Sequence, residues 1–506
     1  MTVTLATFME VLDTSIANVA LPHIAGSLSA GQDESTWVLT SYLVSNAIVL
    51  PISAWASDRI GRKRFYMACV LLFTLSSLLC GLSTSLPMLI FFRILQGAGG
   101  GGLGPSEQAI LADTFKPEQR GMGFAMYGMA VVLAPAIGPT LGGYITDNYS
   151  WHWIFFINVP VGIISLLLSS RMVEDPPWNR DAMKRARSTP IDYMGLGLVA
   201  VGLGALQVVL DKGQREDWFA SHFIQWFTAL SVVGLLGFVL WEWREKNPVL
   251  NLHLLKNRNF ALSNLMMFTL GGVLYGTTVL IPQFLQSVMG YTAQLAGMAI
   301  SPGGLVVMIL MPIVGVLVSR VDPRKLIIFG FIVLALAMFH MTLLYLEIDF
   351  RTAMFYRIYQ ATGLAFLFVP INTLSYAGVP KEQNNQVSSM INLMRNLGGS
   401  FGISFVTTMI ARRSQVHQNL LSHDTGDSML MQRRLQGMSG VFGGRFGDGP
   451  GAMQRAYASI YETMQQQSAV LAYKDTIIAM AIIILLLIPL VLFARKPQQG
   501  EVHLGH

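Results

Sequence analysis

The chain consists largely of apolar runs separated by short polar segments. Most runs reach the length of roughly 18 residues or more that lets a helix cross the hydrocarbon core of a bilayer. A segment in lipid must satisfy its own backbone hydrogen bonds, and the alternating pattern of a membrane β-barrel is absent. Of the 506 residues, 53% are hydrophobic and only 12% are charged, about half the usual charge of a soluble domain. The sequence therefore predicts an all-α integral membrane protein.

The boundaries of the apolar runs predict 14 transmembrane helices. We expect them at residues 3–24, 36–56, 66–83, 88–111, 123–146, 152–170, 192–211, 222–242, 259–281, 293–318, 325–346, 352–377, 389–410 and 471–494.

The basic residues between these runs predict the orientation of the chain. If the segment "SDRIGRKRF" at 57–65 is cytoplasmic, the segments on its side hold 21 of the 34 Lys and Arg residues. The short loops on the other side hold three: Lys212, Arg215 and Arg351. This asymmetry follows the positive-inside rule and predicts that both termini are cytoplasmic. The net charge of +6 is then a consequence of topology, so no nucleic-acid partner is expected.

The segment 411–470 is predicted to be a long periplasmic loop between the last two spans. Its six Arg residues do not contradict the orientation, because long loops are translocated largely regardless of charge. The part "GMSGVFGGRFGDGPG" at 437–451 is typical of a flexible segment. Residues 453–476 have helical spacing, so we expect them to extend the last span away from the membrane.

An internal repeat indicates how the spans are organised. The stretch "RILQGAG" beginning at Arg93 matches "RIYQATG" beginning at Arg357, at an offset of 264 residues. Spans 2–5 thus recur as spans 10–13, which predicts two six-helix halves with two inserted helices between them. We expect an N-terminal bundle at 1–171, inserted helices with charged flanks at 172–258, and a C-terminal bundle at 259–506. Duplicated halves of this kind are a transporter architecture, with the substrate site near the midplane between them.

Six charged residues fall inside the predicted spans: Glu10, Asp13, Arg93, Glu107, Arg357 and Arg395. A charge at the bilayer centre costs at least roughly 2.5–3.5 kcal/mol, so such residues normally face a cavity or a partner. They are therefore the first candidates for function.

Glu10 and Asp13 are the strongest candidates for proton coupling. They are three residues apart and lie on one helix face. Carboxyl groups in such a place can exchange protons. Arg93 has a depth at which it could meet Asp13 and stays charged, so such a pair would titrate through its acid. The alternative is a static buried ion pair that fixes helix packing.

The other intramembrane charges have structural alternatives. Glu107 is a further coupling candidate, but it lies nearer the cytoplasmic end of its span and could reach water instead. For Arg357 and Arg395, structural contacts to carbonyl groups or partner acids are the favoured interpretation.

The glycine-rich stretches are interpreted as helix-packing motifs. "GAGGGGLG" at 97–104 lacks the Gly-Lys-Ser/Thr ending of a phosphate-binding loop and lies within an apolar span. Small residues allow close approach of helices there and in "APAIGPTLGG" at 134–143.

In combination, these motifs resemble the major facilitator superfamily, in its fourteen-span drug:proton antiporter branch, and most closely the EmrB-type multidrug efflux pumps. The similarity covers nearly the whole chain. The first-span motif is present as "LDTSIANVALP", with Asp13 as its acid, and the span-4 motif as "RILQG". Glu10 departs from the pattern, where an uncharged residue is usual.

Two further motifs support this resemblance. "AWASDRIGRK" matches the motif between spans 2 and 3, with Ala54 replacing the usual glycine. Its matching residues are Asp58, Arg59, Gly61, Arg62 and Lys63. "APAIGPTLGG" resembles the antiporter motif of span 5 through Gly138, Pro139, Gly142 and Gly143.

The resemblance implies a conformational switch. Asp58 would cap a helix N-terminus in the opposite half, where an acid meets the positive end of the helix dipole. Arg59 and Arg62 would join this charge cluster, which would hold the cytoplasmic side closed. Ser319 stands where Asp58 stands in the first copy, so the lock would be asymmetric.

The resemblance also implies location, partners and activity. It implies an inner-membrane exporter of lipophilic small molecules that is driven by the proton motive force and needs no other cofactor. Its partners would be membrane lipids, a periplasmic adaptor (EmrA-type) and an outer-membrane channel (TolC-type).

Other functions remain as alternatives. The first is a narrow exporter of one metabolite, siderophore or lipid, and a proton-coupled importer is another, which the span-5 motif disfavours. An enzyme is not expected, because the sequence has no nucleophile–base arrangement, metal spacing or nucleotide loop. A sensor is not expected either, because no large soluble output domain is present.

Overall fold

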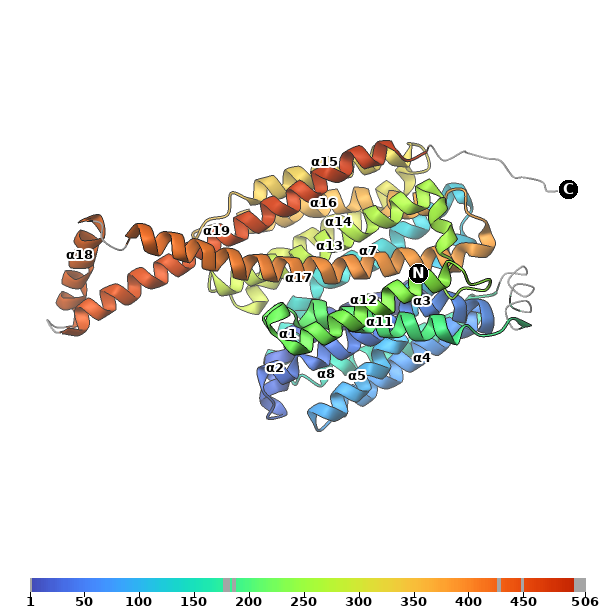
Figure 1. Ribbon diagram of the computed structural model, residues 1–506, viewed down its shortest axis with the longest axis horizontal. Coiled ribbons are helices and arrows are strands. Elements are labelled where there is room, and N and C mark those ends of the chain that lie inside the picture. Colours follow the sequence, from blue (N-terminus) through green and yellow to red (C-terminus); the bar gives the residue numbers. More distant parts are fainter. Residues whose placement is uncertain (1, 176–182, 184–187, 426–428, 447–449, 496–506) are drawn as a thin grey trace.

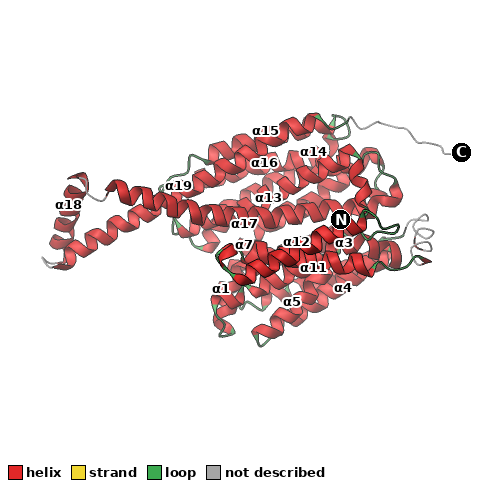
Figure 2. Ribbon diagram, viewed as in Figure 1, coloured by secondary structure: helices red, strands yellow, loops and turns green. Residues whose placement is uncertain are grey.

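The computed structural model describes residues 2–175, 183, 188–425, 429–446 and 450–495. Within these ranges the chain is helical almost throughout and contains no strand (Figure 2). The helices are α1 Thr4–Ser27, α2 Gln32–Ser35, α3 Trp37–Ile60, α4 Arg62–Gly81, α5 Leu86–Gly100, α6 Leu103–Thr114, η1 Pro117–Gln119, α7 Arg120–Asn148, α8 Trp153–Phe156, α9 Asn158–Met172, α11 Tyr193–Lys212, η2 Trp218–Ala220, α12 His222–Glu242, η3 Leu252–Lys256, α13 Arg258–Ser287, α14 Ala293–Leu317, α15 Pro323–Met341, α16 Phe350–Ser375, η4 Lys381–Gln383, α17 Asn384–Thr425, α18 Met429–Phe446 and α19 Pro450–Leu492. Part of the predicted charged segment before α11 and the C-terminal tail lie outside the described residues.

Eleven helical segments within the described ranges are long and apolar enough to cross a membrane. The all-helical membrane architecture is thereby confirmed, whereas the count of 14 spans stays a prediction. The three remaining predicted spans coincide with α1, α16 and α17, which are long helices of lower apolarity. These three carry the buried charged side chains Asp13, Arg357 and Arg395.

Several helix pairs join the regions before α11 and after α12. The most extensive of these contacts are those of α7 with α14 and of α3 with α17. Glycines allow the first contact, because a Cβ atom on Gly121 of α7 would lie 2.6 Å from the carbonyl oxygen of Gly315 on α14. The inserted helix α11 packs against both α3 and α17, and α12 packs on the outside of α11.

The predicted fourth span is divided into α5 and α6 at Gly101–Gly102. A Cβ atom on Gly99 would lie 2.6 Å from the backbone nitrogen of Phe73 on α4. A Cβ atom on Gly101 would lie 2.6 Å from the carbonyl oxygen of Asn46 on α3. This confirms the prediction that the glycine stretch lets neighbouring helices approach closely, since any larger side chain would separate them.

The segment 411–470 is not the loop that the sequence suggested. Its first part continues α17 to Thr425, its middle part forms α18, and α19 already begins at Pro450. The long ends of α17 and α19 run together away from the bundle, with α18 beyond them (Figure 1). The chain's N-terminus and the end of α19 lie at the opposite end of the molecule (Figure 1).

The expectation of a flexible segment at 437–451 is wrong for the residues described, because α18 extends to Phe446. The prediction that residues 453–476 extend the last span as a helix is confirmed, because α19 runs from Pro450 to Leu492. The polar composition of this segment suggested a loop. Its helices are nevertheless formed, because α17 and α18 pack against α19. Asp475 of α19 accepts hydrogen bonds from Arg413 Nε at 2.6 Å and interacts with His417 Nε2 at 2.8 Å, both on α17.

Candidate functional site

Asp13 is the centre of a buried polar site formed by α1, α5 and α9. Its carboxylate is only 2% exposed. Oδ2 accepts a hydrogen bond from Arg93 Nη1 at 2.6 Å, while Oδ1 accepts from Gln96 Nε2 at 3.0 Å and from Asn158 Nδ2 at 2.7 Å. We refer to these four residues as the Asp13 site. The structure thus brings together Asp13 and Arg93, which the sequence places 80 residues apart.

Arg93 is fixed by more than its acid partner. Its Nε donates to the carbonyl oxygen of Val38 at 3.1 Å, and its Nη1 also donates to Gln96 Oε1 at 2.7 Å. The guanidinium carbon lies 4.2 Å from the centre of the Tyr42 ring, a cation–π contact. Removing one partner of a buried ion pair costs about 3–5 kcal/mol, so Asp13 and Arg93 stabilise each other in this conformation.

Glu10 lies one turn earlier on α1 and faces α3. Its Oε1 accepts hydrogen bonds from the Tyr42 hydroxyl at 3.0 Å and from Asn46 Nδ2 at 3.2 Å. Tyr42 therefore connects the two acids, with its hydroxyl on Glu10 and its ring against Arg93. Asn46 Oδ1 in turn accepts from Asn396 Nδ2 of α17 at 3.4 Å, so Glu10 is linked to the C-terminal region through one amide.

Glu107 on α6 does not reach water. Its side chain is fully buried, and neither carboxyl oxygen has a hydrogen-bond partner among the described residues. The alternative that Glu107 lies in an aqueous environment is wrong for this conformation. Helix α6 packs against α1, so Glu107 is enclosed among helices.

Arg395 belongs to a polar network that joins α6 and α7 to α16 and α17. Its Nη1 donates to the Tyr127 hydroxyl, which donates to Asn392 Oδ1. Asn392 Nδ2 donates to Gln108 Oε1, and Gln108 Nε2 donates to Asn372 Oδ1. All five side chains are buried. Hydrogen-bonded polar groups at this depth specify how the two regions fit, because unpaired ones would cost free energy.

A second network joins α3, α4 and α6 to the beginning of α17; we call it the α3–α17 cluster. Asn385 Nδ2 donates to Asp58 Oδ1, and Arg62 Nε donates to Asn385 Oδ1 at 2.7 Å. Arg62 is also paired with Asp113, whose other oxygen accepts from Asn384 Nδ2. The acids therefore lie at the N-terminus of α17, where the helix dipole favours negative charge.

The other residues of the loop motif lie around this cluster. Gly61 has φ +102° and joins α3 to α4, a conformation that favours glycine. Arg59 Nη1 donates to the carbonyl oxygen of Thr189 at 3.1 Å, before α11. Lys63 Nζ donates to the carbonyl oxygen of Ser170 at 2.7 Å, on α9. Arg62 contacts the start of α17 through Asn385.

The span-5 motif brings α7 against α1, the helix of Asp13. A Cβ atom on Gly138 would lie 2.5 Å from Ser15 Cβ, and one on Gly142 would lie 3.2 Å from Ile16 Cγ2. Thr140, which follows Pro139, packs against Gly297 of α14. Gly143 is less crowded, because the nearest atom to a Cβ there would be 3.9 Å away.

The second copy of the span-4 motif has the same geometry without an acid. Arg357 Nη1 donates to Gln360 Oε1 at 2.7 Å, as Arg93 does to Gln96. At the offset of 264 residues, Thr277 of α13 corresponds to Asp13. Arg357 Nη1 donates to the Thr277 hydroxyl at 3.3 Å, and Gln360 Nε2 donates to it at 2.5 Å. A neutral hydroxyl thus replaces the carboxylate.

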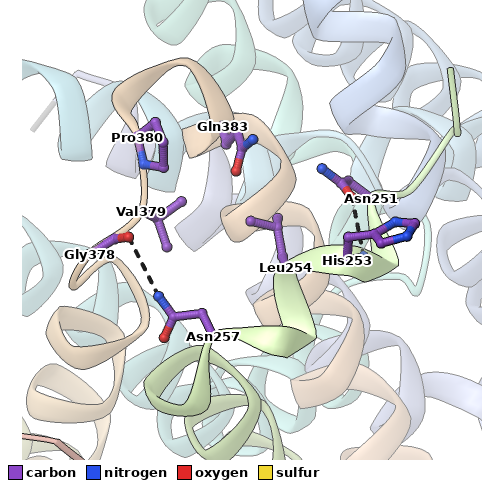
Figure 3. A pocket seen from close by; sticks show the side chains of 8 residues that line it. All are labelled: Asn251, His253, Leu254, Asn257, Gly378, Val379, Pro380 and Gln383. Carbon is purple, nitrogen blue, oxygen red and sulfur yellow. Dashed lines mark hydrogen bonds between the residues drawn. The ribbon is translucent and has the colours of Figure 1, made fainter. Parts of the chain in front are cut away.

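An open cavity of about 190 Å³ lies away from these acids, between η3 and the turn that connects α16 to α17. In this cavity the Asn257 side chain donates to the carbonyl oxygen of Gly378 at 3.5 Å (Figure 3). Its lining contains no acid, so it adds no coupling group: Asn251, His253, Leu254, Asn257, Gly378, Val379, Pro380 and Gln383. Among the described residues, no group of three or more His, Cys, Asp and Glu side chains could hold a metal ion.

A model of the family described as Major Facilitator Superfamily matches residues 3–403. The chain belongs to the major facilitator superfamily. It is 36% identical to Multidrug export protein EmrB of Escherichia coli (strain K12), over 97% of this chain and 94% of the relative. It is also 36% identical to Fatty acid resistance protein FarB of Neisseria gonorrhoeae, over 97% of this chain and 95% of that protein.

A solved structure supports the facilitator fold. The MFS proton:xylose symporter XylE aligns with a TM-score of 0.58 at 15% identity, over 92% of this chain and 93% of that chain. At this identity the likeness concerns the fold alone. The relatives and the solved structures are transporters, in agreement with the prediction that this facilitator is not an enzyme.

Several residues of these sites were missed in the sequence. Asn158 and Tyr42 contact the two acids of α1, and Asp113 and Asn385 complete the α3–α17 cluster. The available signal was a single polar residue inside or at the end of an apolar run. That signal is weak, since many such residues in this facilitator only bond their own helix, as Thr407 does.

Proposed function

We propose that this facilitator is a proton-coupled multidrug exporter of the inner membrane. It would cross the membrane 14 times, with both termini cytoplasmic. Residues 1–171 would form the N-terminal bundle, 172–258 the inserted helices with their flanks, and 259–506 the C-terminal bundle. The relatives that are named as export and resistance proteins over nearly their full length support this proposal.

The observation that carries the proposal is the Asp13 site. A carboxylate that is buried against Arg93 on the first helix can exchange its charge partner for a proton when the surrounding helices move. Asp13 binds the proton on the outer side and releases it on the inner side as substrate binds. Glu10, joined to it through Tyr42, helps to set the charge of the pair.

The proton gradient supplies enough free energy for export. One proton that moves inward down 100 mV contributes about 2.3 kcal/mol before any pH gradient is added. At a factor of 10 for each 1.4 kcal/mol, this supports a concentration ratio of roughly 50 for a neutral substrate. No cofactor other than the proton motive force is needed.

The α3–α17 cluster is the proposed switch. With Asp58 and Arg62 bound at the start of α17, the cytoplasmic side is closed. Opening toward the cytoplasm separates these groups, and re-forming the contacts returns the transporter to this conformation. Gly138 and Gly142 keep α7 in contact with α1, so that movement of one helix is transmitted to the other.

The helical projection formed by the ends of α17 and α19 with α18 is the proposed contact for a periplasmic adaptor of EmrA type. A TolC-type channel would complete the export route. The projection extends away from the bundle at the end opposite the N-terminus, which agrees with a periplasmic position (Figure 1).

A narrow exporter of one lipid class is the second candidate, favoured by the name of the fatty acid resistance relative. Reconstituted vesicles with an imposed pH gradient test both proposals. We expect gradient-dependent transport of several structurally unrelated lipophilic compounds. Transport of a single compound class would favour the narrow exporter, and transport that ignores the gradient would contradict proton coupling.

A further inference from the structure

We propose that the inserted helix α11 moves as part of the N-terminal bundle and separates from α17 when the transporter opens toward the cytoplasm. The inference rests on the proposed function, because it requires two bundles that move relative to each other. It gives a mechanical role to the inserted helices, which the Asp13 site and the α3–α17 cluster do not use.

Helix α11 lies antiparallel to α3 and is fixed to it along its length. At the end of α11, Asp211 accepts a hydrogen bond from the Thr40 hydroxyl. Farther back, a Cβ atom on Gly204 would lie 3.2 Å from Ile48 Cδ1. Just before α11 begins, the carbonyl oxygen of Thr189 accepts a hydrogen bond at 3.1 Å from an arginine in the last turn of α3. Both ends of α11 are therefore held by α3.

Lys212, the last residue of α11, strengthens this attachment. Its side chain is buried, and its Nζ donates to the Thr36 hydroxyl and to the carbonyl oxygen of Asp33 at 3.4 Å. The Nζ also lies 4.9 Å from the centre of the Trp37 ring, at the start of α3. Hydrogen bonds from a charged donor are stronger than those between neutral groups. Because a buried ammonium without acceptors would be costly, α11 is expected to stay with α3.

The polar contact of α11 with α17 is of a weaker kind. Ser400 Oγ of α17 donates to Gln207 Oε1 of α11 at 2.8 Å, and both groups are neutral. Gln207 lies one turn before Asp211, so neighbouring turns of α11 contact the two bundles. Helix α11 thus lies between the bundles, with a charged attachment on the side of α3 and a neutral one on the side of α17.

The chain that follows α12 is attached to the other bundle. Gln386, in the first turn of α17, accepts a hydrogen bond from the backbone nitrogen of Asn251 at 3.1 Å. Its Nε2 donates to the carbonyl oxygen of Val249 at 3.3 Å. Since α12 packs on α11, the relative movement is taken up in the connection 243–248, between the end of α12 and Val249.

Cross-linking of paired cysteines in the full-length protein in vesicles tests the proposal. Thr40→Cys/Asp211→Cys links α11 to α3, and Gln207→Cys/Ser400→Cys is the matched pair that links α11 to α17. Exchange of labelled drug across the membrane without a gradient should remain close to that of the parent after the first link. The second link should reduce exchange by roughly 10-fold or more, because it prevents a conformational step of the cycle. The parent, whose two cysteines are buried, is treated with the same reagent as the control.

Reduction of the second link should restore exchange, which shows that this variant is folded. Loss of exchange after the link to α3, or full exchange after the link to α17, would overturn the proposal.

A second measurement leaves these contacts intact. Spin labels at the exposed positions Tyr193 and Ile60 report the distance from α11 to α3, and labels at Tyr193 and Lys381 report the distance to the turn before α17. Both distances are compared with and without Asp58→Asn, which we expect to favour the open form. The distance to Lys381 should increase, whereas the distance to Ile60 should not change. Equal changes in both distances, including none, would overturn the proposal.

The test is separable from the proposed function. Exchange is measured without a gradient, whereas proton coupling is measured by gradient-driven accumulation of drug in vesicles of the parent protein. A parent that accumulates drug, together with a link to α17 that is tolerated, refutes only the inference about α11. A parent that exchanges drug but ignores the gradient refutes only proton coupling.

Discussion

We predict that removing Asp13 lowers the free energy of unfolding more than removing Arg93 does. In Asp13→Asn the guanidinium of Arg93 keeps its charge in a fully buried position, because arginine is not deprotonated in proteins. Breaking a buried pair from this side should reduce the free energy of unfolding by about 3–5 kcal/mol. In Arg93→Gln the remaining acid keeps its hydrogen bonds from Gln96 and Asn158 and can also take up a proton. That loss should be about 1–3 kcal/mol.

The double variant Asp13→Asn/Arg93→Gln removes both charges together. Its loss of stability should be smaller than the sum of the two single losses, because neither charge is left without the other. The free energy of unfolding in mixed micelles, followed by tryptophan fluorescence, measures all four proteins. Equal losses in the two single variants, or additive losses in the double variant, would refute the view that this pair is a desolvated ion pair.

Two further predictions concern the switch and helix packing. Asp58→Asn and Asn385→Ala should each shift the balance between closed and open forms by roughly 10- to 100-fold and slow turnover, with equilibrium drug binding preserved; lost binding would contradict a switch role. Gly138→Ala should lower the free energy of unfolding by about 1–3 kcal/mol, because its Cβ would collide with Ser15. Gly143→Ala is the matched control in the same motif and should unfold like the parent, so a similar loss in both would argue against the α1–α7 contact.

The sequence was sufficient for the features that depend on local pattern. Apolar runs predicted the helices, whereas the two six-helix halves inferred from the repeat between Arg93 and Arg357 stay a prediction. The motif residues around Asp58 and Gly138 were sufficient for the family, which the comparisons confirm. These features could be predicted because each is encoded in consecutive residues.

The features that depend on packing were not predictable in the same way. Glu107 was placed by depth along its span, but its side chain is fully buried among helices that include α1. Tyr42 and Asn158 approach the acids only because α3 and α9 have a particular rotation. The helical end of α17 was not predicted, because its composition is polar. It is stabilised by packing on α19 and by the contact of Asp475 with Arg413.

The central claim is that Asp13 carries the coupled proton. Drug-induced proton release in inverted vesicles tests this claim directly, with Glu10→Gln as the matched variant on the same helix. Asp13→Asn should still bind drug, which shows that it is folded, but addition of drug should release no protons. The parent and Glu10→Gln should both release protons. Full drug-induced proton release from Asp13→Asn would contradict the account.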